Sequence, residues 1–189
     1  MSAPLKVPTT YADWSECLDY FEAGIDDDAA LSVMGSGTLS WTGGVAPLFA
    51  RRVSAALDTR IKRIADELSR GIRLGADFNA LARAMLDARK KLAQLYQLAS
   101  LPVLAEELRG SLEQQLTQYA QTAQNSLEDS ARHDRSGQLA STIRQCSLLN
   151  FKAHAAAIPQ PTDVGTSSAA HRPDAGRPSG PVRRRNILV

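Results

Sequence analysis

Aromatic side chains are scarce in this chain: Phe, Trp and Tyr make up 5% of its 189 residues, although hydrophobic residues as a whole reach 43%. Leu, Ala, Ile and Val must therefore build most of the core, which favours helix-on-helix packing over a sandwich of aromatic-rich strands. The length suits one ordinary domain. Composition alone thus predicts a single, mainly α-helical domain.

Cysteines are few, and leader signals and long apolar runs are absent. Cys17 and Cys146 lie far apart, each at an apolar position of a predicted helix, which indicates buried thiols rather than a disulfide framework. The N-terminus lacks a charged stretch followed by an apolar one, and no run approaches the ~18 apolar residues of a membrane span. We therefore expect a cytoplasmic protein without a membrane span. Arginine outnumbers lysine seventeen to five, a bias typical of GC-rich bacterial genomes.

Motifs for catalysis, metal binding and nucleotide binding are missing too. The glycine cluster at 35–38 lacks the lysine of a phosphate loop and the third glycine of a dinucleotide fingerprint. Three consecutive aspartates, 26–28, point their carboxylates in different directions and predict a helix cap or a solvated acidic patch rather than a Mg²⁺ site. None of the histidines, His133, His154 and His171, has ligand spacing. We expect no catalytic, cofactor-binding or metal site, and no enzyme.

Helical periodicity is the strongest positive signal. Thr10 followed by Asp13 predicts a capping box that opens a short amphipathic helix, which Gly24 ends. Long apolar stripes at i, i+3 and i+4 then predict helices over 45–70 and 77–99, and a third over roughly 101–132 after the interruption at Pro102. A last helix over 139–156 fades before Pro159. These helices are expected to form an antiparallel bundle or a long helical hairpin.

Residues 25–44 carry two competing patterns. Apolar and polar residues alternate over 31–34 and 38–41 around a glycine turn, which favours a small β-hairpin over 31–41. A loop is the alternative, and the aspartates at 26–28 can instead cap a short helix through Leu31. We therefore expect an extended N-terminus over 1–9 and a helical domain over 10–156 that includes this hairpin.

The C-terminal segment, 157–189, has a different composition from the rest of the chain. Five prolines lie between positions 159 and 181 with no apolar periodicity, which predicts a disordered tail. The tail ends in a basic and then apolar peptide, a layout typical of a tethered binding element. Its expected partner-binding residues are Arg183, Arg184, Arg185, Ile187, Leu188 and Val189.

Charge is distributed in blocks. Residues 1–50 hold one lysine and seven acids, a net −6, whereas residues 51–91 hold eleven basic and five acidic groups, a net +6. The basic block offers a candidate nucleic-acid face on two helices. Interleaved acids make a salt-bridged surface facing the acidic segments the more favoured interpretation. The residues of this candidate basic face are Arg51, Arg52, Arg60, Arg63, Lys90 and Lys91.

The helix over 101–132 carries a row of uncharged amides, Gln114, Gln115, Gln118, Gln121, Gln124 and Asn125. Such faces occur at partly solvated helix–helix contacts, including coiled-coil contacts between subunits, so a homo-oligomer through the long helices is one expectation. The function that these features favour is a protein–protein interaction adaptor or accessory subunit with a tethered basic peptide. The alternative is a nucleic-acid-associated protein that uses the basic helices at 51–91.

Overall fold

The computed structural model describes residues 5–41, 44–73, 78–132 and 137–157, and all its regular elements in these ranges are helical. In chain order they are α1 Tyr11–Ala23, α2 Asp27–Gly35, α3 Val45–Arg73, α4 Phe78–Ala99, α5 Glu106–Ala131, α6 Gln138–Gln145, the short 3₁₀ helix η1 Leu148–Asn150, and α7 Phe151–Ala157. The prediction of a mainly α-helical chain is confirmed for these ranges. None of the described helices is both long and apolar enough to span a bilayer.

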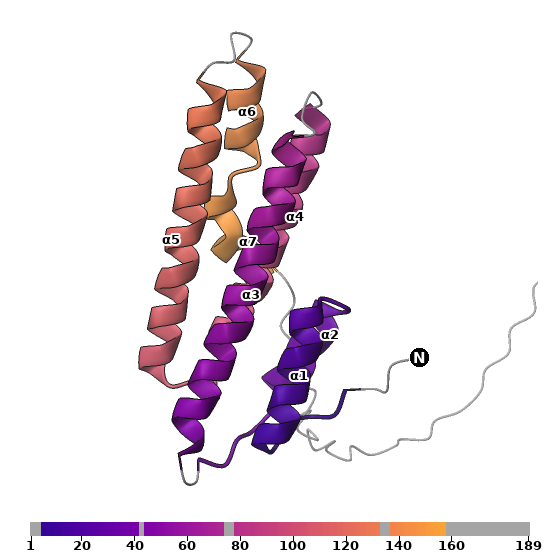
Figure 1. Cartoon of the computed structure of the whole chain (residues 1–189), viewed down its shortest axis with the longest axis vertical. Coiled ribbons are helices and arrows are strands. Elements are labelled where there is room, and N and C mark those ends of the chain that lie inside the picture. The colour runs from indigo at the N-terminus through magenta and orange to yellow at the C-terminus, as the bar shows by residue number, and fades with distance from the viewer. Residues whose placement is uncertain (1–4, 42–43, 74–77, 133–136, 158–189) are drawn as a thin grey trace, which may run out of the picture.

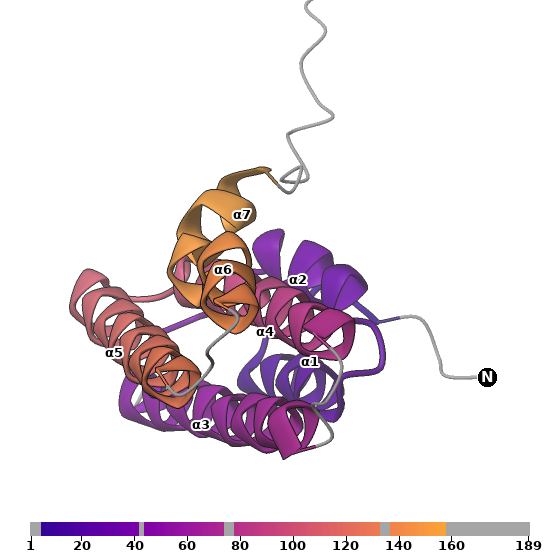
Figure 2. The ribbon, with the colours of Figure 1, turned by 90° about the horizontal axis from the view of Figure 1, so that it is seen from above.

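The long helices α3, α4 and α5 lie side by side and alternate in direction, and α6, η1 and α7 form a broken fourth segment beside α4 (Figure 1). Seen from above, α4 lies in the middle of the molecule (Figure 2). It contacts α2, α3, α5, α6, η1 and α7. The four consecutive residues from Leu92 to Leu95 are buried as a result, so this turn of α4 faces protein on every side.

The helices α1 and α2 form a short pair that packs on α3 and α4 (Figure 1). The predicted capping box is present, because the Thr10 hydroxyl accepts from the Asp13 amide while the Asp13 carboxylate accepts from the Thr10 amide at 2.9 Å. These hydrogen bonds hold the pKa of Asp13 at about 2, below its usual 3.8. Gly24 ends α1 with φ +71, the left-handed conformation that glycine adopts without strain.

The β-hairpin expected over 31–41 is wrong. Residues 31–35 belong to α2, and residues 36–41 form no strand. The Asp26 carboxylate accepts from the Ala29 amide and starts the helix, and Leu31 and Met34 then turn to the core at helical spacing. The alternation of apolar and polar residues over 31–34 therefore belongs to an amphipathic helical turn, and that over 38–41 belongs to the segment that follows it.

The segment after α2 packs against the N-terminal segment rather than against itself. The Thr38 amide donates to the Pro8 carbonyl at 2.9 Å, and the Trp14 indole donates to the Thr38 carbonyl at 2.9 Å. A Cβ at position 37 would lie 2.6 Å from Trp14 and 2.7 Å from Pro8, so this approach requires Gly37.

The last helix predicted over 139–156 is interrupted. Its first part, α6, ends at Gln145, and the Ser147 hydroxyl then accepts from the Leu149 amide at the start of η1. Cys146 and Cys17 are both buried free thiols, as predicted, and burial raises the pKa of the Cys17 thiol.

Candidate functional site: the charge network and the amide face of α5

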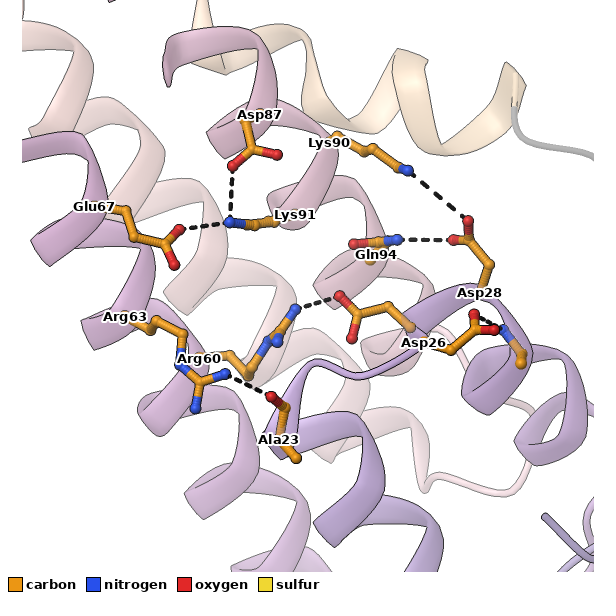
Figure 3. A network of polar contacts seen from close by, with 12 residues as sticks. Ala23, Asp26, Asp28, Arg60, Arg63, Glu67, Asp87, Lys90, Lys91 and Gln94 are labelled. Carbon is orange, nitrogen blue, oxygen red and sulfur yellow. Dashed lines mark hydrogen bonds and ion pairs between the residues drawn. The ribbon is translucent and has the colours of Figure 1, made fainter. Parts of the chain in front are cut away.

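The three consecutive aspartates at the start of α2 serve three different structures. Asp26 caps its own helix. Asp27 forms an ion pair with Arg60 of α3, and Asp28 accepts from Gln94 of α4 at 2.7 Å (Figure 3). Because neighbouring carboxylates point in different directions, Asp27 and Asp28 join α2 to two different helices.

Arg60 is the most deeply buried charged residue of this network. Its side chain is 4% exposed, and its guanidinium lies 5.1 Å from the centre of the Phe21 ring as well as against Asp27. Desolvation of the 11%-exposed Asp27 side chain raises the pKa of that carboxyl, and the Arg60 charge opposes the effect. Gly24 makes room for the guanidinium, since a Cβ there would lie 2.3 Å from one of its nitrogens.

Four more residues of the predicted basic face make contacts within the fold. Arg52 bonds Asp19 and Glu22 of α1, and Arg63 donates to the Ala23 carbonyl at 3.1 Å. Lys90 lies 3.9 Å from Asp28. Lys91 lies 2.5 Å from Glu67 and 2.7 Å from Asp87. We call these contacts, together with the Arg60–Asp27 pair, the charge network; most of them join the acidic N-terminal helices to the basic block of α3 and α4.

Hydrophobic burial, not charge, is what holds α1 and α2 in place. Trp14, Leu18, Phe21 and Met34 are each at most 1% exposed. Fully burying a side chain of this size contributes about 1.5–3 kcal/mol, so these four alone contribute on the order of 10 kcal/mol. An exposed ion pair contributes about 0–1 kcal/mol. We therefore expect α1 and α2 to stay on α3 and α4 at moderate salt.

The structure distributes the six predicted basic-face residues unevenly. Arg51 is exposed, and Lys90 is exposed beside Asp28. Arg52, Arg63 and Lys91 are half-buried, and Arg60 is buried. A phosphate backbone needs several accessible cations on one side, and these six residues do not form such a group while α1 and α2 are bound.

The outer surface of α5 is uncharged over nearly four turns. Between Glu113 and Glu128 the chain has no charged residue, and four amides recur on one exposed face of the helix: Gln114, Gln118, Gln121 and Asn125. We call these four residues the amide face. The Gln121 amide donates to Asn125 at 2.8 Å, whereas the two other predicted amides have structural roles. Gln115 donates to Asp58 at 2.5 Å, and the buried Gln124 accepts from the Leu148 amide at 3.1 Å.

A groove of about 690 Å³ lies along this face from Gly110 to Thr122 and is open to solvent. Most of its lining residues have polar side chains, and one of them, Lys152 of α7, pairs with Glu113 at 2.5 Å. The Lys152 ammonium also lies 5.7 Å from the centre of the Tyr96 ring, which fixes its position. The lining residues are Gly110, Glu113, Gln114, Thr117, Gln118, Gln121, Thr122 and Lys152.

Other titratable groups that the structure describes lie apart from one another. Among the described residues no three His, Cys, Asp or Glu side chains gather as a metal site would require. The Tyr119 hydroxyl is buried between α5 and α3, and burial, with the charge of Asp66, raises its pKa to about 12. A phenol so shifted stays protonated and is a poor base. His154 lies half-buried on α7, and His133 and His171 lie outside the described residues.

The C-terminal binding residues predicted at 183–189 also lie outside the described residues. Sequence reasoning missed three polar positions that the structure connects: Gln94, Lys152 and Glu113. For Gln94 a signal was present, because a polar residue stands inside the apolar run of α4 and must find a partner when buried. For the other two the signal was absent, since their pairing depends on where α7 meets α5.

Comparison of the chain with models of known protein families, with curated proteins and with solved structures found no match.

Proposed function

We propose that this protein is a non-enzymatic adaptor or accessory subunit whose helical bundle docks on another protein through the amide face of α5. The C-terminal peptide, residues 183–189, engages a second partner. The observation that supports this function is a contrast between helices: five of the six basic-face residues contact other groups of the molecule, whereas α5 exposes a long face without charge.

The chemistry of the amide face suits a protein partner. Each glutamine or asparagine side chain offers both donors and an acceptor, so it can bond backbone or side-chain groups of either polarity. Cores of protein interfaces are depleted in charged residues, as this face is. It presents no cation to a phosphate backbone.

The alternative, a nucleic-acid-associated protein that uses the 51–91 helices, has weaker support. Three residues of its candidate face, Arg52, Arg60 and Arg63, each contact α1 or α2. Binding of this kind falls steeply with salt. The two functions therefore differ in a property that is simple to measure.

The test is affinity capture from native lysate with the full chain, with and without nuclease, followed by titration of each captured protein in purified form. Gln118→Arg places a charge on the amide face. Ser126→Arg places the same charge on an exposed position of α5 that lies off this face. We expect Gln118→Arg to lose a partner that Ser126→Arg keeps. Replacing Arg183, Arg184 and Arg185 together by alanine should lose a different one.

Two results would overturn the proposal. If all these variants bind the same purified proteins with unchanged affinity, neither surface is used. If nuclease removes the captured material and the remaining binding disappears at moderate salt, the nucleic-acid function takes its place.

A further inference from the structure

The outer surface of α5 carries a row of exposed residues at coiled-coil spacing. This helix lies at one edge of the molecule (Figure 2). Eight positions, separated alternately by four and three residues, are all exposed, whereas the residues that α5 buries lie on its other side. Such spacing is typical of the seam along which two helices pack. We call these residues the outer row, which extends the amide face by two positions at each end: Glu107, Ser111, Gln114, Gln118, Gln121, Asn125, Glu128 and Arg132.

The middle of the outer row is complementary to itself when it is read in the opposite direction. Its spacing is symmetric about the midpoint between positions 119 and 120. An antiparallel second copy therefore places Gln118 of each chain opposite Gln121 of the other, and Gln114 opposite Asn125. Each amide then meets an amide, which can both donate to it and accept from it. No charge lies between Glu113 and Glu128 to oppose this contact.

The ends of the outer row carry charges, and these charges decide the direction of pairing. In the antiparallel arrangement Glu107 of each chain lies opposite Arg132 of the other, and the Ser111 hydroxyl can donate to the Glu128 carboxylate. Arg132 is 78% exposed and pairs with Asp129 of its own chain at 3.0 Å, so it is accessible to a second acid.

A parallel arrangement would instead set each of these charged residues opposite its own copy, and like charges would repel each other. Charge therefore selects the antiparallel, two-fold arrangement, in which the same surface serves both copies.

We propose that α5 pairs with α5 of a second copy of this chain, antiparallel and along the outer row. This pairing rests on the proposed function, since it takes the amide face as a protein-binding surface and names a second copy as its partner. The groove then receives the second helix: Gly110, Thr117 and Thr122 have small side chains or none, and they leave holes beside the amides for its longer side chains.

The pairing is expected to be weak. No large apolar side chain belongs to the outer row, whereas tight interfaces bury aromatic or aliphatic anchors. All eight residues are exposed in the single chain, so each contact between copies replaces hydrogen bonds to water. Dimer formation should therefore depend on chain concentration within the micromolar to millimolar range.

The experiment measures dimer formation by sedimentation equilibrium of the full chain, at concentrations up to about one millimolar. Glu107→Arg sets two arginines opposite each other at both ends of the pair, and Arg132→Glu sets two acids there. We expect each variant to raise the dimer dissociation constant by about tenfold. Glu106→Arg, the same change at an exposed neighbouring position off the outer row, should leave it unchanged. Circular dichroism confirms that the helices are intact in each variant.

A mixture of variants tests the direction and register of the pairing. An equimolar mixture of Glu107→Arg and Arg132→Glu chains should pair as tightly as the parent, because opposite charges then meet at both ends of the mixed dimer. Positions 107 and 132 lie about 37 Å apart along α5, at 1.5 Å for each residue. No contact within one chain can therefore produce this rescue.

A chain that stays monomeric at every concentration would overturn the proposal. So would a dimer that Glu107→Arg and Arg132→Glu weaken no more than Glu106→Arg does, or one that the mixture of the two single variants fails to restore. None of these measurements involves a different protein. Failure of the dimer therefore leaves the partner titrations above unaffected, and failure of those titrations leaves the dimer unaffected.

Discussion

Removing Arg60 tests what the buried ion pair between α2 and α3 contributes to stability. The side chains of Arg60 and Asp27 are 4% and 11% exposed, so neither charge is well hydrated. Arg60→Met keeps much of the aliphatic volume and leaves the Asp27 carboxylate buried without its cation. Loss of one partner of a buried pair costs about 3–5 kcal/mol, and we expect the free energy of unfolding at pH 7 to fall by that amount.

Two further variants separate this cost from lost packing. Replacing both partners, Arg60→Met with Asp27→Leu, removes the unpaired charge, and buried pairs replaced by apolar residues are often neutral in stability. The double variant should therefore regain most of the loss. Arg52→Met is the exposed control: its partner Asp19 is 71% exposed, and we expect at most about 1 kcal/mol.

The effect of Arg60→Met also has a definite dependence on pH. Burial raises the pKa of Asp27, and Arg60 opposes this in the parent chain. Without Arg60 the folded-state pKa rises further, so the folded variant binds a proton that the unfolded chain still lacks. Its stability therefore improves as pH falls, and the deficit relative to the parent should shrink between pH 7 and about pH 4.

Urea unfolding followed by far-ultraviolet circular dichroism measures all four chains at both pH values. If Arg60→Met cost no more than Arg52→Met, the Arg60–Asp27 pair would not behave as a buried pair. The same would follow if the double variant were as unstable as the single one, or if the deficit grew on acidification.

Three other perturbations follow from local geometry. The folded-state pKa of Asp13 is lowered, so the parent chain should lose a contribution to stability on acidification between pH 3.8 and about pH 2. Asp13→Asn should lack this contribution, and acid unfolding curves that coincide for the two chains would contradict this. Gly24→Ala should cost more than the 1–2 kcal/mol of a left-handed backbone, whereas Gly44→Ala, with φ +77 and open space around it, should cost only that strain. Gln124→Leu leaves the buried Leu148 amide without its acceptor and should lower the free energy of unfolding in urea by about 1–3 kcal/mol.

The opposite charge blocks of the sequence find their explanation in the charge network. A net −6 N-terminal block and a net +6 block that follows it can attract each other or two separate partners. Composition does not choose between these, because Coulomb attraction is not directional. The buried aromatic and aliphatic residues of α1 decide which of the two occurs. They pack this helix on α3 and so bring Asp19 and Glu22 to Arg52.

The β-hairpin prediction failed for a related reason. Over 31–34 the apolar residues satisfy both a period of two and a helical turn, so periodicity alone does not discriminate. The Asp26 cap and the contacts of Leu31 and Met34 with the core decide for helix. A similar limit applies to α4, whose predicted apolar stripe begins at Phe78; that residue is 40% exposed, whereas Ala93 and Gln94, off the stripe, are buried.

By itself the sequence determined that the chain is mainly helical, where α1 begins and ends, and that its long helices each have an apolar face. These properties arise from interactions among residues three or four positions apart, which the sequence displays directly. Tertiary structure alone decided that the turn Leu92–Leu95 of α4 is enclosed on all sides, that Arg52, Arg60 and Arg63 contact α1 or α2, and that an open groove remains on the outer face of α5. Those properties depend on which helices meet and where each one ends, and no local pattern encodes the length of a neighbour.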